Sequence, residues 1–498
     1  MTEAALLAQV RALRANYRRA AQVLPWLDAA RWEDDPPAFG EFADDPGLPA
    51  VPRAVLKPDG PLPETGTLVR WEPERSGPLE ALHRRLEELA RAGLSLVVLH
   101  TDLAVDGIGT LAARHPRLRI VIESGALKIL YFIEPIERLM RARPKVWLCT
   151  ANLCNWLGLE RLCAAGLGDR LLFGTHAPRF NAHVAMGPIV MGRMSAEQKR
   201  AIAGDNLRRL LGLPSAPARA EETFAPGPAF VIDAHGHSGP SGRFPAADES
   251  FAPGDWLRFM DECAIEQLFL CPMQAIDDPS VDARTHIREL LAAAPGRVRW
   301  FEVCPPAPDA ALLARIEVSL RDPACAGIKI HPSLHGVAAD DEAYAPAFAL
   351  AERTGAALLT HSWEASATNP IQHLSLPARF ERHLRKHPHT RLVLGHAGGR
   401  PSTIDSVADL CARYPGVCVD IAGDYFDSGL VEMLCARLGP QCVLFASDVN
   451  WIDPRANLAA VLASRLPDED ALRVLRTNAL RVFERSANGC IDRPSANR

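Results

Sequence analysis

Short apolar runs of strand length alternate with helical segments eight times in the second half of the chain. The runs occupy residues 229–235, 267–271, 298–304, 327–331, 356–361, 391–396, 416–421 and 442–448. Helical patterns such as 255–263, 283–293, 310–320, 343–353 and 430–438 separate them. This alternation is typical of β-α units with parallel strands. Eight units in about 255 residues predict a closed (β/α)8 barrel, with its chemistry at the C-terminal ends of the strands.

Polar residues stand at five of these eight strand ends. They are His235 and His237 on the first strand, Lys329 and His331 on the fourth, His361 on the fifth, His396 on the sixth and Asp448 on the eighth. Two histidines one residue apart in a strand point to the same face, although the HxH pattern alone is more often a pair of loop residues than a pair of ligands. The agreement of five strand ends favours a site. Three imidazoles and one carboxylate suit a single divalent ion, zinc first, with iron, manganese or nickel as alternatives.

Five stretches of the second half carry a resemblance to a known family. They are IDAHGHSG (232–239), GIKIHPSLHG (327–336), LLTHSWE (358–364), LVLGHAGG (392–399) and LFASDVNW (444–451). In this order they resemble the amidohydrolase superfamily. The closer resemblance is to its branch of small single-metal amidohydrolases, which includes aminocarboxymuconate-semialdehyde decarboxylase and resorcylate-type decarboxylases. The resemblance covers residues 229–485 and implies a TIM barrel.

The resemblance also implies a role for each strand-end residue. His235, His237 and His361 would be metal ligands. Asp448 would bind the metal or take a proton from its water, and His396 would act as a base or electrophile beside it. In some amidohydrolases a lysine on the fourth strand is carboxylated and bridges two metals. We expect a single-metal site here, so Lys329 and His331 are assigned to a substrate carboxylate. Trp363 is expected to line the pocket.

The first half contains a weaker set of the same signals. An amphipathic helix is expected over 4–29 and irregular chain over 30–65. Five strands follow at 67–71, 94–100, 118–124, 145–150 and 170–175, with helices such as 78–92 and 196–211. The stretch RLRIVIESGA (117–126) resembles TRLVLGHAGG with Ser124 in the place of His396, and GDRLLFGTHAP (168–178) has His176 in the place of Asp448. His100 ends its strand as His361 does.

These likenesses predict an internal repeat in which the first copy has lost its site. No HxH precedes it, and three strands of a barrel are missing unless residues 30–65 supply some of them. We therefore expect residues 1–213 to form a degenerate, non-catalytic amidohydrolase-like domain. The second domain, a second copy in a homo-oligomer or another polypeptide would complete it, because open sheet edges must be covered. Residues 214–228 are the expected linker, 229–485 the catalytic barrel and 486–498 a C-terminal tail.

Composition excludes several other classes of function. The net charge is -5 without a long basic run, so no nucleic acid or anionic membrane is expected as a partner. No apolar stretch reaches the length of a spanning helix and no signal core follows the N-terminus, which predicts a cytoplasmic location. The 12 cysteines are scattered without a CxxC pair and indicate reduced, buried thiols.

Three functions remain open at this point. The first is a metal-dependent hydrolase that uses metal-activated water on a small anionic or cyclic substrate. The second is a non-oxidative decarboxylase or hydratase of the same fold, in which the metal binds the substrate directly. The third is a non-catalytic assembly partner, against which the retained ligand set of the second half argues.

Overall fold

The computed structural model describes residues 1–32, 34–125, 128–217, 222–239, 252–366 and 369–484. The chain divides into two compact units. The C-terminal unit comprises Met1–Leu13, Pro226–Tyr425 and Val431–Arg498, and the N-terminal unit comprises Arg14–Ala225 and Phe426–Leu430. The change between them at residues 225 and 226 falls inside the predicted linker, 214–228. The predicted tail, 486–498, lies outside the described residues.

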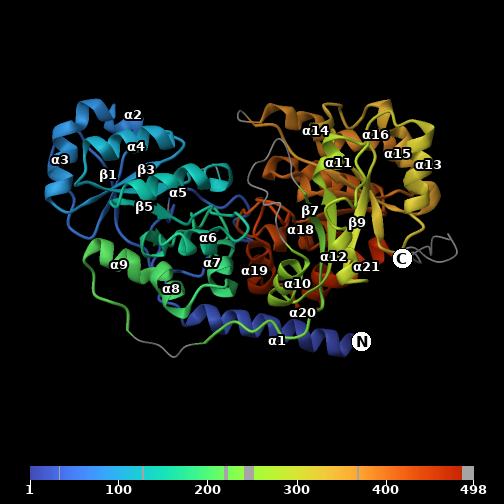
Figure 1. The fold of residues 1–498 in the computed structure, drawn as a ribbon, viewed down its shortest axis with the longest axis horizontal. Helices are drawn as coiled ribbons and strands as arrows, with labels where there is room; N and C mark the ends of the chain where they lie inside the picture. The colour runs from blue at the N-terminus through green and yellow to red at the C-terminus, as the bar shows by residue number, and fades with distance from the viewer. Residues whose placement is uncertain (33, 126–127, 218–221, 240–251, 367–368, 485–498) are drawn as a thin grey trace. The chain divides into compact units, whose positions relative to one another are not determined.

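Eight parallel strands form the sheet of the C-terminal unit (Figure 1). They are β7 (Val231–Ser238), β8 (Ile265–Pro272), β9 (Val298–Val303), β10 (Cys325–Ile330), β11 (Ala357–His361), β12 (Arg391–Gly395), β13 (Val417–Asp420) and β14 (Val443–Leu444). Neighbours in sequence are neighbours in the sheet. The first and last strands meet through backbone bonds from Ala234 N to Phe445 O and from Asp448 N to His235 O. The predicted (β/α)8 barrel is confirmed.

Helices follow the strands along the chain of this unit. They are α10 (Pro253–Glu262), α11 (Met273–Asp277), α12 (Arg288–Ala293), α13 (Ala310–Ser319), α14 (Pro332–His335), α15 (Ala345–Thr354), α16 (Glu381–Leu384), α17 (Ile404–Arg413), α18 (Leu430–Leu438), α19 (Pro454–Ala463), α20 (Asp468–Leu472) and α21 (Asn478–Phe483). Several have the expected end signals. The Asp309 carboxylate caps α13 by accepting from Leu312 N at 2.7 Å, and α15 ends at Gly355, whose φ is +65°.

Apolar side chains fill the lower part of the barrel interior. Ile232, Phe269, Phe301, Val393 and Cys418 belong to this buried cluster, against which the last helix, α21, packs. Because side chains two residues apart in a strand share a face, the residue two positions beyond each of these inward residues also points inward, nearer the C-terminal end. On β13 that residue is Asp420, which is fully buried. The barrel therefore carries polar groups above an apolar floor.

The N-terminal unit is built on a parallel sheet of six strands in sequence order. They are β1 (Arg53–Val55), β2 (Leu68–Arg70), β3 (Ser95–Leu99), β4 (Arg119–Glu123), β5 (Val146–Cys149) and β6 (Leu171–Leu172). The helices assigned to this half of the chain are α1 (Glu3–Gln22), α2 (Pro73–Ser76), α3 (His83–Arg91), α4 (Val105–Arg114), α5 (Ile133–Ala142), α6 (Gly158–Ala164), α7 (Ala182–Met191), α8 (Ala196–Arg200) and α9 (Asn206–Leu211). The sheet has fewer strands than the eight of a complete barrel.

Two sequence expectations for this unit need correction. The first helix ends at Gln22 and not at residue 29, because Pro25 disfavours helical backbone at the residue before it and cannot donate inside a helix. The region 30–65 is not wholly irregular, since it supplies β1. Residues 28–30 also join the two edges of the sheet: Asp28 N donates to Pro49 O, Ala29 N donates to Phe173 O and His176 N donates to Ala30 O. The edges expected to be open are thus linked within the chain.

Among the described residues, no helix combines the length and apolarity needed to cross a bilayer.

Candidate metal centre

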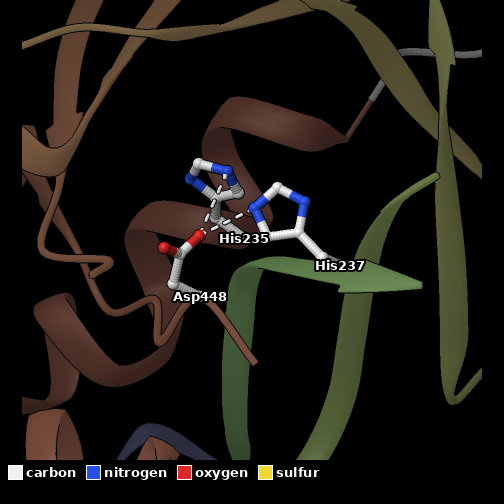
Figure 2. A group of neighbouring side chains, drawn as sticks. All are labelled: His235, His237 and Asp448. Carbon is white, nitrogen blue, oxygen red and sulfur yellow. Dashed lines mark hydrogen bonds and ion pairs between the residues drawn. The ribbon is translucent and has the colours of Figure 1, made fainter. Parts of the chain in front are cut away.

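Three buried side chains converge where β7 ends and β14 has passed into its loop (Figure 2). His235 and His237 lie on β7, and Asp448 follows β14. The distance from His237 Nε2 to Asp448 Oδ1 is 2.7 Å, and from His235 Nε2 to the same oxygen 3.9 Å. One ligand atom from each residue lies within 4.8 Å of the other two. Among the described residues, this is the group of histidine, cysteine and carboxylate side chains arranged to hold a metal ion.

Asp420 fixes the orientation of the first histidine. Its Oδ2 lies 3.0 Å from His235 Nδ1, and its Oδ1 accepts from the backbone N–H groups of His396 at 2.8 Å and Ala422 at 3.0 Å. A carboxylate can only accept, so His235 carries its proton on Nδ1 and presents the Nε2 lone pair to the site. Burial, followed by the nearby Lys329, lowers the pKa of His235 to about 3. The ring is therefore neutral, as a ligand must be.

Asp448 is held as a carboxylate. Burial opposes its ionisation, but His237 and the other imidazoles outweigh that effect and keep the pKa of Asp448 well below its usual range. Burial also lowers the pKa of His237. Asp448 has a left-handed φ of +70°, and its N–H donates to His235 O at 2.8 Å. Two neutral imidazoles and one carboxylate in mutual reach fit a single divalent cation.

Lys329 lies inside the site rather than at its rim. Its side chain is fully buried at the end of β10, and Nζ donates to His235 Nε2 at 2.9 Å. The position beside His235 Nε2 therefore attracts positive charge. The charge of the Lys329 side chain would in turn attract an anion. Lys329 thus lies beside the candidate metal ligand His235. Its contact with a substrate carboxylate stays a prediction.

His361 lies next to the three donors but outside the set that is mutually close. Its Nε2 is 2.8 Å from Gln372 Oε1, and Gln372 Oε1 also accepts from Ser333 Oγ at 2.8 Å. Since an amide oxygen only accepts, His361 carries its proton on Nε2 and keeps the Nδ1 lone pair. Its role as a fourth ligand stays a prediction.

His396 stands on the neighbouring strand end with its ring centroid 5.2 Å from that of His235. Its Nδ1 donates to Ala422 O at 3.0 Å, which leaves the Nε2 atom as the one available to a ligand. The ring centroid is also 4.7 Å from that of His361. The predicted site residues His235, His237, His361, His396 and Asp448 are thus brought together, while their individual roles stay predictions.

Flat rings form two walls beside the donors. The rings of His331 and His361 stack at 4.2 Å with 10° between their planes, and Trp363 continues the stack at 6.0 Å and 7°. Trp451 stacks on His237 at 4.9 Å and 22°. The guanidinium carbon of Arg400 lies 5.9 Å from the Trp363 ring centroid. These walls favour a planar ligand, and the cations near them favour a negative one.

Sequence reasoning missed three residues of this region. Asp420, Gln372 and Trp451 hold or flank the histidines. Asp420 had a usable signal, because it ends the apolar run Val417–Asp420 at the same end of the barrel as the other polar residues. Gln372 lies in the short 3-10 helix Pro370–Ser375 and had none, and Trp451 ends the stretch LFASDVNW without a role being expected for it.

Comparison with known proteins agrees with this geometry. Residues 232–485, just over half of the 498, match the family described as amidohydrolase. No curated protein matches.

Several solved structures are similar. Among them are 5-carboxyvanillate decarboxylase of Sphingomonas paucimobilis (18% identity, 47% of this chain and 83% of that one, TM-score 0.37) and 2,6-dihydroxybenzoate decarboxylase of Rhizobium (16%, 51% and 98%, TM-score 0.41). Another is an uncharacterised TIM-barrel protein of Bordetella bronchiseptica (14%, 51% and 97%, TM-score 0.42).

Proposed function

Since this chain belongs to the amidohydrolase family, we propose that its C-terminal unit is a metal-dependent, non-oxidative decarboxylase of a small planar carboxylic acid. The observation that carries the proposal is the combination of a buried lysine at the ligand cluster with stacked flat rings beside it. A lysine suits a carboxylate, and parallel rings suit an aromatic or unsaturated body. The ligand set alone would serve several reactions.

The donors would bind one metal ion through His235 Nε2, His237 Nε2 and Asp448 Oδ1, with His361 as the fourth ligand. We keep zinc as the first expectation, with manganese, iron and nickel as alternatives. Such an ion supplies positive charge that polarises a bound oxygen. The low pKa of His235 supports this binding, because the ring itself is not protonated on Nε2; the hydrogen bond that Lys329 Nζ donates to that atom would give way to the ion.

The protein groups then have to manage charge and one proton. Decarboxylation replaces a carboxylate on carbon by hydrogen, so one proton must reach that carbon as carbon dioxide leaves. Two groups at the site could carry this proton, the Asp448 carboxylate and His396 Nε2. Neither has all of its polar atoms engaged in the hydrogen bonds described above. Lys329 would hold the substrate anion and the His331–His361–Trp363 stack would orient its plane.

A substrate panel with two readouts tests the proposal. Purified protein is incubated with hydroxylated benzoates and unsaturated diacids, and carbon dioxide release is measured. In D₂O, the product should carry one deuterium at the carbon that lost its carboxylate. Release of carbon dioxide with deuterium incorporation is the expected result. Hydrolysis of lactones, esters or amides with no carbon dioxide from any acid would reject decarboxylation.

Hydrolysis is the second candidate, and one observation favours it. Asp448 is ionised in the site and can accept a proton from water, as a hydrolase requires. The same panel decides between the two reactions. A third outcome, no metal in the protein and no turnover, would favour a non-catalytic assembly partner.

We further propose that the N-terminal unit is a degenerate copy of the C-terminal one. Support comes from matching hydrogen bonds. Thr175 donates to Asp28 as Ser447 donates to Asp233. His176 N donates to Ala30 O at 2.8 Å, as Asp448 N donates to His235 O.

The closing helices of the two units match as well. Asn206 Nδ2 donates to Gly168 O and Leu171 O at 2.8 and 2.9 Å. Asn478 Nδ2 donates to Pro440 O and Val443 O, both at 2.7 Å. In each unit a π-helical turn, Ala201–Asp205 or Arg473–Thr477, precedes the asparagine.

This correspondence places Ala30 at the position of His235, Trp32 at that of His237 and His176 at that of Asp448. Glu123 takes the position of Gly395, and it is 1% exposed. Arg53 donates to it at 2.7 Å, Trp32 Nε1 donates to it at 3.2 Å, and His176 Nε2 lies 3.2 Å from it. The Glu123–Arg53 ion pair thus lies among the residues that correspond to the candidate metal ligands of the other unit. This supports a non-catalytic role for the N-terminal unit. Whether a second copy of the chain or another protein covers this unit is a further proposal, tested by native mass spectrometry.

A further inference from the structure

Two cysteines lie side by side at the floor of the C-terminal barrel. Cys418 is on β13, and Cys442 immediately precedes β14. The next residues along, Val419 and Val443, are paired in the parallel ladder. Neighbouring strands are about 4.8 Å apart, and disulfides need a Cα separation of roughly 4.4–6.8 Å. The backbone therefore already meets the requirement for a disulfide between them.

The two sulfurs interact, and a cation stands beside them. The Cys418 and Cys442 side chains influence each other electrostatically. Arg481 Nη2, on α21, lies 3.6 Å from Cys418 Sγ and also donates to Gln441 O at 2.6 Å, which anchors it there. Thiols beside a guanidinium ionise more readily than isolated thiols.

The pKa of Cys418 differs from that of other buried thiols of the unit. The hydrogen bond from Cys442 outweighs burial and, with Arg481, lowers the pKa of Cys418 to about 7, while the same bond raises the pKa of Cys442. The pair thus shares one negative charge. Burial raises the pKa of Cys271 and of Cys304 to about 12, so those thiols stay protonated.

We propose that Cys418 and Cys442 are a hydroperoxide-reactive pair that closes into an intramolecular disulfide. The Cys418 thiolate attacks the O–O bond of a hydroperoxide, ROOH, and becomes a sulfenic acid, while RO⁻ leaves and takes a proton as ROH. The Cys442 sulfur then attacks the Cys418 sulfur, and hydroxide leaves with the Cys442 proton as water. Sulfur is oxidised by two electrons and the peroxide is reduced by two.

Access and proximity are consistent with this order. Cys418 is 1% exposed, whereas Cys442 is half-buried. The two residues stand side by side at neighbouring strands, one position before the paired Val419 and Val443, so the second step needs no rearrangement of the strands. The two cysteines take no part in the proposed decarboxylation.

The experiment treats the full-length protein with graded hydrogen peroxide at pH 7, blocks free thiols and maps the cysteines by mass spectrometry. We expect a Cys418–Cys442 cross-link and the loss of two thiols. Because the Arg481 guanidinium lies 3.6 Å from Cys418 Sγ and stabilises its thiolate, Cys418 should react roughly tenfold faster than the other cysteines.

Variants assign the roles. Cys442→Ser should stop the reaction at a sulfenic acid on Cys418, which dimedone traps. Arg481→Gln should slow the reaction several-fold, with partial recovery in Arg481→Lys. Cys411→Ser is the matched control, because Cys411 neighbours the pair and burial raises its pKa to about 12; its reaction should equal that of the unmodified protein.

Three outcomes would overturn the proposal. They are oxidation of Cys418 no faster than that of Cys271, a cross-link to Cys411 in place of Cys442, or a disulfide only between separate chains. If Cys442→Ser fails to fold, the cross-link map and the relative rates in the unmodified protein decide the matter without it.

Discussion

The two units hold the same pair of backbone and side-chain contacts around Asp28 and Asp233, and they differ in what surrounds those contacts. In the C-terminal unit the first strand continues into His235 and His237, and the space between them and Asp448 fits a cation. In the N-terminal unit the corresponding stretch, residues 28–32, contains Ala30 and Trp32 instead, and the Glu123–Arg53 ion pair occupies the interior. The hydrogen bonds of Asp28 and Asp233 that close each sheet therefore do not depend on the presence of the candidate metal ligands.

One exchanged position illustrates the difference. Gly395 leaves room for the His235 ring, because a Cβ there would lie 3.2 Å from His235 Cε1 and 2.6 Å from Thr360 O. Glu123 can stand at the matching place since Ala30 has no ring. The arginine compensates the charge of this buried carboxylate.

The largest expected effect comes from removing both histidines. His235→Ala with His237→Ala should reduce bound metal from about one equivalent per chain to near zero and abolish turnover, since two of the donors are gone. Elemental analysis of the purified protein measures this. His176→Ala in the N-terminal unit is the matched control and should leave the metal content unchanged. Full metal content in the double variant would show that His235 and His237 are not what distinguishes the two units.

A single substitution should introduce into the C-terminal unit the buried carboxylate that the N-terminal unit has at Glu123. Gly395→Glu places a side chain against Thr360 O and His235, so we expect loss of metal and destabilisation by about 1–3 kcal/mol or more. Metal content and chemical denaturation are the measurements. Gly254→Glu, at a glycine with open space around its Cβ position, is the control. Retained metal in Gly395→Glu would show that the two positions are not equivalent.

The converse test removes the ion pair. Glu123→Ala leaves the half-buried Arg53 without its partner and should destabilise the N-terminal unit by about 3–5 kcal/mol, measured by denaturant unfolding. Glu134→Ala, from an exposed pair with Arg161, should change stability by less than about 1 kcal/mol. Equal effects of the two variants would contradict the role given to Glu123.

The same residue predicts a pH dependence. Burial opposes ionisation, but Arg53 and His176 outweigh it and keep the pKa of Glu123 far below its usual range. A lowered folded-state pKa means that this stabilisation is complete above the unfolded-state pKa of about 4.3 and is lost as the pH falls below it toward the folded-state value. Unfolding of Glu123→Ala should lack this acid-dependent part. An identical acid profile in both proteins would be inconsistent with it.

The smallest expected effect concerns the support of a ligand. Asp420→Asn keeps the shape but loses the carboxylate that orients His235, so metal affinity should fall roughly 10–100-fold. A competition titration with a chelator measures it. Asp405→Asn, at a surface pair with Arg437, should have no effect. An unchanged affinity in Asp420→Asn would remove Asp420 from the site.

The sequence was sufficient for the barrel and for the gathering of its polar strand ends. Short apolar runs at regular spacing predicted the strands. Parallel strands bring their C-terminal ends together, so the polar residues at those ends, among them His235 and Asp448, were expected to lie close to one another. It was insufficient for β1, whose three residues lie in a stretch rich in Pro and Asp, and for the bridge through residues 28–30. Gln372 was missed because its partners come from other elements, which no local pattern reveals, whereas Asp420 could have been found as the polar end of the run Val417–Asp420.

The seam between the first and last strands has a consequence for the order of folding. The Asp233–Ser447 contacts join residues 214 positions apart, and the three candidate donors span the same seam. Contacts this distant along the chain carry a large loop-closure cost and form late. The metal-binding end is thus expected to be assembled only after residue 448 has been synthesised and the barrel has closed. A nascent or truncated chain ending before that residue would fold strands without acquiring the site.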